Sequence, residues 1–113
     1  MKTIKGNLIL KEDTTFKESI KVEGNIKGYF DLKVKGDIYC VNITCRNIYC
    51  YNIDCWNINC RDIYCYNIDC WNINCRDIYC MNIIYCDKIK CKKEIKAKKL
   101  IKNRFKLKQK VWK

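Results

Sequence analysis

The chain has 113 residues, enough for one domain, and it contains no proline or histidine but 11 cysteines. No apolar run approaches the roughly 18–20 residues that span a bilayer, and the N-terminus lacks the apolar stretch of a signal peptide. We therefore predict a single cytoplasmic domain with reduced cysteines and no membrane contact. The net charge is +12, and residues 81–113 carry 12 lysines and one arginine against two acids.

The first third of the chain repeats every six residues. An apolar residue or threonine stands at each step, and a second apolar residue or glycine usually follows two positions later. The first members are Leu8, Thr14, Ile20, Ile26, Leu32 and Ile38. Strand side chains alternate between two faces, so an inward pair at i and i+2 indicates a short strand. Residues 1–35 are therefore expected to form hexad-type coils.

A five-residue repeat follows. Residues 36–80 form nine pentads of the form x-[N/D]-I-x-C, segments 51–65 and 66–80 are identical, and the pattern continues to Cys91 after one inserted residue. A period of five matches no helical stripe. We predict an all-β solenoid in which short strands stack coil on coil. Isoleucine and cysteine should fill the core, while asparagine supplies turns and side-chain ladders.

The charge pattern bears on the number of sides. Coils of three pentads would have three sides and would stack Arg46, Arg61 and Arg76 directly on one another. Coils of four pentads would have four sides and would place Arg46 against Tyr66 and Arg76 against Trp56. Like charges directly opposite each other are destabilising. The pattern therefore favours four sides, and it leaves open how the hexad coils are shaped and how they join the pentad coils.

The pentads resemble the pentapeptide-repeat family, in which an [N/D]-[L/I/F] step recurs every five residues. The resemblance covers about residues 36–91 and implies a right-handed, four-sided β-helix. The family usually has a small residue two positions before the central apolar one, where this chain has Arg, Tyr or Trp. The hexads, as in V-E-G-N-I-K-G, resemble the bactofilin type of polymer-forming β-helix over about residues 4–40.

Large side chains are expected on the outside of the coil. They form either ladders that stiffen the surface or a binding face, because Trp, Tyr and Arg are common interface anchors. Aromatic rings between arginines also suit stacking on nucleobases. The candidate binding residues of this face are Arg46, Trp56, Arg61, Trp71 and Arg76.

Residues 92–113 are expected to form a basic cap over the open end of the core, as a helix or as strands. The cap is either merely solvated or a docking surface for nucleic acid or an acidic protein. Its charged residues are Lys92, Lys93, Lys96, Lys98, Lys99, Lys102, Arg104, Lys106, Lys108 and Lys110.

The sequence offers no basis for catalysis, since it has no histidine, no glycine-rich phosphate loop and no serine-centred elbow. Cysteines five apart in a column do not make a tetrahedral metal site, so no metal or cofactor is expected. The favoured hypothesis is a non-enzymatic binding protein, a small inhibitor or adaptor acting on a nucleic-acid-handling protein. The alternatives are a bactofilin-like self-assembling protein, with a dimer through the N-terminal end, and a direct nucleic-acid binder.

Overall fold

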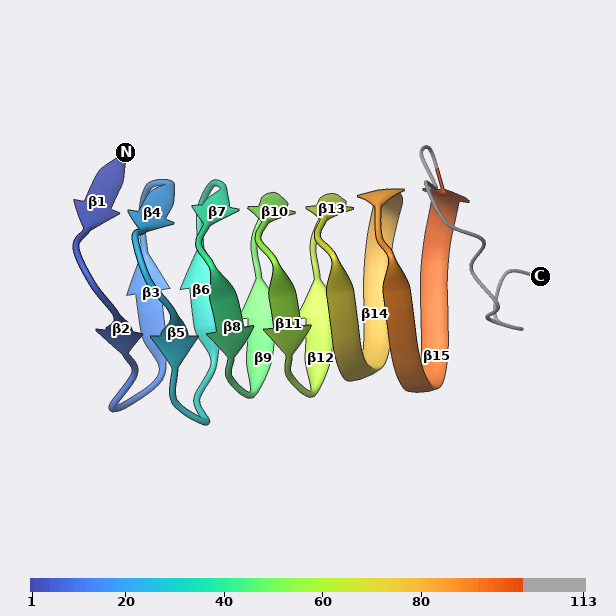
Figure 1. Cartoon of the computed structure of the whole chain (residues 1–113), viewed down its shortest axis with the longest axis horizontal. Helices are drawn as coiled ribbons and strands as arrows, with labels where there is room; N and C mark the ends of the chain where they lie inside the picture. Colours follow the sequence, from blue (N-terminus) through green and yellow to red (C-terminus); the bar gives the residue numbers. More distant parts are fainter. Residues whose placement is uncertain (101–113) are drawn as a thin grey trace.

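The computed structural model describes residues 1–100, without the side chains of residues 84, 85 and 98–100. This part of the chain is an all-β solenoid of about six turns, built from parallel strands and free of helix (Figure 1). The predicted fold class, an all-β solenoid, is confirmed. The coils stack along the long axis of the molecule, so residues far apart in sequence become neighbours.

Most strands are only two or three residues long, because a turn follows each inward pair. They are β1 (Lys2–Ile4), β2 (Leu8–Ile9), β3 (Thr14–Phe16), β4 (Ile20–Val22), β5 (Ile26–Lys27), β6 (Leu32–Val34), β7 (Ile38–Tyr39), β8 (Asn42–Thr44), β9 (Asn47–Tyr49), β10 (Asn52–Asp54), β11 (Asn57–Asn59), β12 (Asp62–Tyr64) and β13 (Asn67–Asp69). Two longer strands, β14 (Asn72–Tyr85) and β15 (Lys88–Leu100), continue around the corners of the coil.

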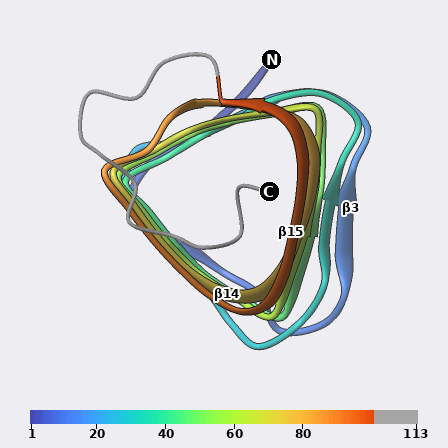
Figure 2. The same cartoon turned by 90° about the vertical axis from the view of Figure 1, so that its right-hand side faces the viewer.

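Each coil has three sides, and the end-on view is a triangle (Figure 2). In the pentad region each strand pairs in parallel with the strand three pentads further on, as Ile53 with Ile68 and Ile58 with Ile73. One side contains β1, β4, β7, β10 and β13, the next contains β2, β5, β8 and β11, and the third contains β3, β6, β9 and β12. The predicted four-sided coil is therefore wrong.

Stacked arginines are tolerated because aspartates lie between them. Arg76 Nη2 is 3.3 Å from Asp62 Oδ2, and Arg76 Nε is 3.2 Å from Asp77 Oδ2. Arg61 Nε is 3.8 Å from the same oxygen of Asp62. The charge balance of this edge therefore depends on aspartates next to the arginines in sequence and on the neighbouring coil, as well as on the residues directly opposite.

The hexad coils are also three-sided, and they join the pentad coils gradually. Each N-terminal coil holds three hexads, as the pairing of Lys2 with Ile20 shows. The spacing then falls to three pentads, one side at a time, through the pairs Ile20–Ile38, Ile26–Ile43, Leu32–Ile48 and Ile38–Ile53. Since each shortened side loses one residue, the isoleucine columns continue unbroken from one region into the other.

Isoleucine fills the core and cysteine fills the corners beside it, as predicted. The isoleucines and leucine that are at most 2% exposed are Ile20, Ile26, Leu32, Ile38, Ile43, Ile48, Ile53, Ile58, Ile63, Ile68, Ile73, Ile78, Ile83 and Ile89. The 11 cysteines are free thiols, buried or partly buried against this cluster. Burying each isoleucine contributes roughly 1.5–3 kcal/mol relative to leaving it exposed.

Asparagine side chains form the predicted hydrogen-bonded ladders along the corners, but the pentad asparagines begin the strands and do not form the turns. Asn82 Nδ2 donates to Asn67 Oδ1 (2.8 Å), Asn67 to Asn52 (2.6 Å), and Asn52 to Asp37 Oδ1 (2.9 Å). A second ladder runs along the next corner from Asn72 through Asn57 and Asn42 to Asn25. Because each amide both donates and accepts, a stack of identical residues satisfies itself.

The start of the predicted basic cap is a further coil of the solenoid. β15 pairs with β14 in parallel along its length, so residues 92–100 extend the stack as strand. The spacing between paired residues grows here, from Cys75–Cys91 to Asp77–Glu94, because one extra residue enters this corner. Residues 101–113 lie outside the described part of the chain, and so does the remainder of the predicted cap.

Candidate functional site

Three columns of outward side chains run along the edges of the triangular solenoid. They hold the first residue of each pentad, and each backbone N–H donates to the carbonyl of the equivalent residue one coil earlier, at 2.7–3.0 Å. We call them the tyrosine edge (Tyr51, Tyr66 and Met81), the tryptophan edge (Val41, Trp56 and Trp71) and the arginine edge (Arg46, Arg61 and Arg76). The predicted outer residues are therefore outside the core, but they lie on separate edges.

The aromatic rings on these edges stack face to face with one another. Trp56 and Trp71 have ring centroids 5.3 Å apart and planes 7° apart, and Tyr51 stacks on Tyr66 at the same distance. A nucleobase could enter between two rings only if they were about 7 Å apart, because each stacked layer takes up about 3.5 Å. These rings are therefore too close together to hold a base between them. The tryptophans are nevertheless 57% and 41% exposed, so their outer ring atoms remain available for contact.

A third aromatic ladder lies on the flat side formed by β9, β12 and β14. The sequence predicted that its tyrosines face outward but not which side of the coil they occupy. Tyr64 stacks between Tyr49 and Tyr79, with centroid distances of 4.8 and 5.0 Å. Lys33 Nζ lies 5.3 Å from the ring centre of Tyr49, and Lys96 Nζ lies 6.0 Å from that of Tyr79. Cations therefore close both ends of the ladder, each contributing about 0.5–1 kcal/mol at an exposed site.

The arginine edge is neutralised by carboxylates. Arg46 Nε is 2.9 Å from Asp31 Oδ1, and its Nη2 is 3.3 Å from Asp13 Oδ1. The hydrogen bond from Arg46 holds the pKa of Asp31 below its ordinary value. Arg61 and Arg76 are paired with aspartates in the same way. The arginines of the candidate binding face are therefore already compensated within the molecule.

Positive charge also gathers on the last described coil, where residues 86–97 hold five lysines and two acids. Lys88, Lys90, Lys92, Lys93 and Lys96 lie there on β15. The Nζ of Lys96 is 4.0 Å from Glu94, whereas no carboxylate of residues 1–100 lies within ion-pair distance of the other four lysines. We call Lys88, Lys90, Lys92 and Lys93 the lysine row.

The structure thus brings together Lys92, Lys93 and Lys96 of the predicted basic surface. The backbone of Lys98 and Lys99 continues the same strand. Lys102, Arg104, Lys106, Lys108 and Lys110 lie outside the described residues. Sequence reasoning missed Lys88 and Lys90 because they fall inside the repeat, although the alternation of inward and outward positions marks both as outward.

Comparison with models of known protein families, with curated proteins and with solved structures finds no match. Across residues 1–100, no helix has the length and apolar character needed to cross a membrane. In the same part of the chain, no group of three or more His, Cys, Asp or Glu side chains is arranged to hold a metal ion.

One like-charge contact gives a first prediction. Asp54 pairs in register with Asp69, and burial together with that neighbouring carboxylate raises the pKa of Asp54. A carboxyl pKa raised by folding means that ionisation costs stability above that pKa. Asp54→Asn should therefore raise the free energy of unfolding at pH 7 by a few tenths to about 1 kcal/mol.

The gain should vanish near pH 3, where the aspartate is protonated in both the folded and unfolded states. Urea unfolding at both pH values measures it. Asp69→Asn serves as the matched variant, because it removes the same repulsion from the other side. A variant at position 54 that is less stable than the wild type at pH 7 would contradict the assignment.

Proposed function

We propose that this chain is a non-enzymatic binding protein whose last described coil docks onto an acidic surface of a protein partner. The observation that supports this proposal is the contrast between the arginine edge and the lysine row. The arginines are paired with aspartates, whereas no carboxylate of residues 1–100 lies within ion-pair distance of the lysine row. Unbalanced charge on a rigid strand attracts and orients a partner of opposite sign.

The exposed aromatic edges supply contact area for such a partner. Trp56 is 57% exposed and Tyr51 is 55% exposed, and both are held in stacks. Ordering them on binding costs little because their rotamers are already fixed by stacking. Trp and Tyr are enriched among the residues that dominate interface energies. A protein partner is favoured over nucleic acid because the stacked rings largely cover one another's faces.

The class of partner to test first follows from the repeat. Residues 36–91 resemble pentapeptide repeats, a family with members that inhibit topoisomerases. An inhibitor or adaptor of a nucleic-acid-handling protein is therefore the leading form of this proposal. Self-assembly of the bactofilin kind is disfavoured for contacts between two last coils, because these would bring two lysine rows together.

The test compares two variants with the same change in net charge. In one, Lys88, Lys90, Lys92 and Lys93 are replaced by glutamate. In the other, the exposed N-terminal residues Lys5, Lys11, Lys17 and Lys35 are replaced by glutamate. Immobilised full-length wild-type protein captures a partner from cell lysate, and the affinity of the purified partner is then measured for all three forms.

The proposal expects the lysine-row variant to lose at least about tenfold in affinity and the N-terminal variant to stay within about twofold. Equal losses of affinity in the two variants would show that the partner responds to net charge and not to a site on the last coil, and this result would overturn the proposal. A gel shift with a short DNA duplex is run in parallel at low and high salt. A DNA shift that depends on the lysine row, without a protein partner, would replace the proposal with direct nucleic-acid binding.

A further inference from the structure

The first coil of the solenoid, at its N-terminal end, presents an open sheet edge (Figure 1). Within residues 1–100, β1, β2 and β3 each pair with one strand only, which are β4, β5 and β6 of the second coil. The other edge of each of these three strands has no partner strand in this part of the chain. Such an edge is a template on which a further chain can add hydrogen-bonded strands.

Each strand of the first coil has one residue whose backbone groups face this open edge. The neighbours of these residues are bonded to the second coil at 2.6–2.9 Å, through the N–H groups of Lys2, Leu8, Leu10 and Thr14 and the carbonyls of Ile4 and Phe16. Successive residues of a strand direct their N–H and C=O groups to opposite sides. The backbone groups of Thr3, Ile9 and Thr15 therefore face away from the second coil.

The open edge is complementary to itself. Thr3, Ile9 and Thr15 are six residues apart, and each lies on a different side of the triangle. A second copy turned over about a two-fold axis across the rod brings its strands in antiparallel. With the axis through the side of β3, Thr15 faces Thr15 of the second copy, and Thr3 faces Ile9 in both directions. Directly opposed residues of an antiparallel pair can exchange two hydrogen bonds, so each open residue meets a matching one.

The inward side chains of the first coil are also incompletely covered. Ile4 and Leu8 are only partly buried against the core. Their partners one coil further on, Val22 and Ile26, are 2% and 0% exposed, because a coil lies on both sides of them. A coil stacked on the open edge would remove the remaining apolar surface from water, which favours association.

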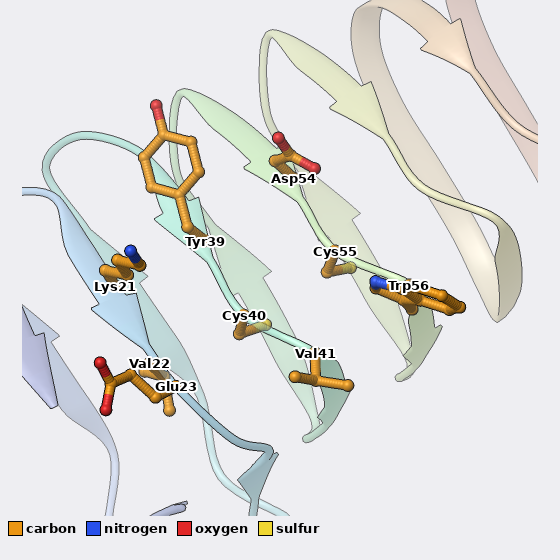
Figure 3. Close-up of a pocket in the computed structure, with 9 residues that line it drawn as sticks. All are labelled: Lys21, Val22, Glu23, Tyr39, Cys40, Val41, Asp54, Cys55 and Trp56. Carbon is orange, nitrogen blue, oxygen red and sulfur yellow. The ribbon is translucent and has the colours of Figure 1, made fainter. Parts of the chain in front are cut away.

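The groove of about 470 Å³ beside the tryptophan edge is a different kind of surface (Figure 3). Along it the N–H of Trp56 donates to Val41 at 2.7 Å and that of Val41 donates to Gly24 at 3.0 Å, so this backbone is already bonded between coils. The charged side chains that line it have both signs: Lys21, Glu23 and Asp54. The open edge of the first coil therefore suits a second copy better than this groove does.

We propose that two copies of this chain bind each other through the open edges of their first coils, with β3 antiparallel to β3 and β1 antiparallel to β2. Residues 1–18 contain four lysines and three acids, whereas residues 86–97 contain five lysines and two acids. Two first coils can therefore meet with little repulsion, whereas two last coils repel each other. The assembly stops at a dimer, which leaves both lysine rows at its free ends.

The test measures the oligomeric state of the full chain by sedimentation equilibrium over a range of protein concentrations. The wild type should show a monomer–dimer equilibrium. Thr15→Pro removes the N–H at the centre of the contact, and proline is tolerated where the N–H of an edge strand faces away from its sheet. It should weaken the dimer at least about tenfold, because two hydrogen bonds are lost per dimer. The matched control, Thr15→Val, keeps the N–H and the branched shape and should stay within about twofold.

Hydrogen exchange of the wild type provides a second measurement. The backbone amides of Thr3, Ile9 and Thr15 should exchange more slowly at concentrations at which the dimer forms, and dilution should remove this protection. Circular dichroism checks that the variants fold. If Thr15→Pro does not fold, the exchange of these three amides still decides the question.

Four results would each overturn the proposal. They are a monomer at every concentration, species larger than a dimer, equal effects of proline and valine at position 15, and a dimer in which the three amides stay unprotected. None of them would bear on the acidic partner proposed above, because the lysine row lies on the last described coil, at the other end of the stack (Figure 1).

Discussion

Replacing Ile58 by alanine is expected to lower the free energy of unfolding by about 2–5 kcal/mol. Ile58 is 1% exposed and lies in a core column between Ile43 and Ile73. Its strand is hydrogen-bonded on both sides, so the coils cannot close around the missing atoms and a cavity remains. Urea unfolding followed by circular dichroism measures the loss.

The control is the next residue on the same strand. Asn59 points outward, and Asn59→Ala should change the free energy of unfolding by no more than about 0.5 kcal/mol. Equal effects at positions 58 and 59 would contradict the alternation of inward and outward residues, and with it the described core.

Asn67→Ala should cost about 1–3 kcal/mol, although it removes only a small polar side chain. Asn67 donates to Asn52 at 2.6 Å and accepts from Asn82 at 2.8 Å. Alanine leaves one acceptor and one donor in a partly buried ladder without their partners. The midpoint of thermal or urea unfolding reports the loss.

Asn74→Ala is the comparison for the ladder, because Asn74 is exposed on a flat side rather than set in a corner. Its replacement should have little effect on stability. If the variants at positions 67 and 74 lose the same amount, the ladder contributes nothing beyond an ordinary surface asparagine.

Much of the fold follows from the sequence because the inward pairs repeat without a break. The i, i+2 spacing of isoleucine and cysteine predicts the strands and the core, and both are found. The pentad asparagines, predicted as turn residues, instead begin the strands. The predicted number of sides is wrong because it gave like-charge repulsion too much weight. The sequence also contains a feature that favours three sides. Its two identical segments of three pentads place Tyr on Tyr, Trp on Trp and Asn on Asn when each coil has three sides.

The candidate site was less predictable because it depends on neighbours distant in sequence. Arg46 meets Asp31 and Asp13, which lie 15 and 33 residues away, and no local pattern shows that these three residues converge. The sequence therefore makes the arginines look available although they are paired. Half of the lysine row, Lys92 and Lys93, was predicted from the excess of lysine near the C-terminus, whereas Lys88 and Lys90 were missed because they fall inside the repeat.

The identical segments 51–65 and 66–80 have a length equal to one full turn of the triangle. Duplicating such a unit adds a whole layer without rotating any side relative to its neighbours. The rod then grows by about 4.8 Å, and every edge gains one more copy of its own side chain. The length of the rod and the number of side chains on each edge are therefore coupled. A duplication of this kind increases both, while the sequences of the two ends stay the same.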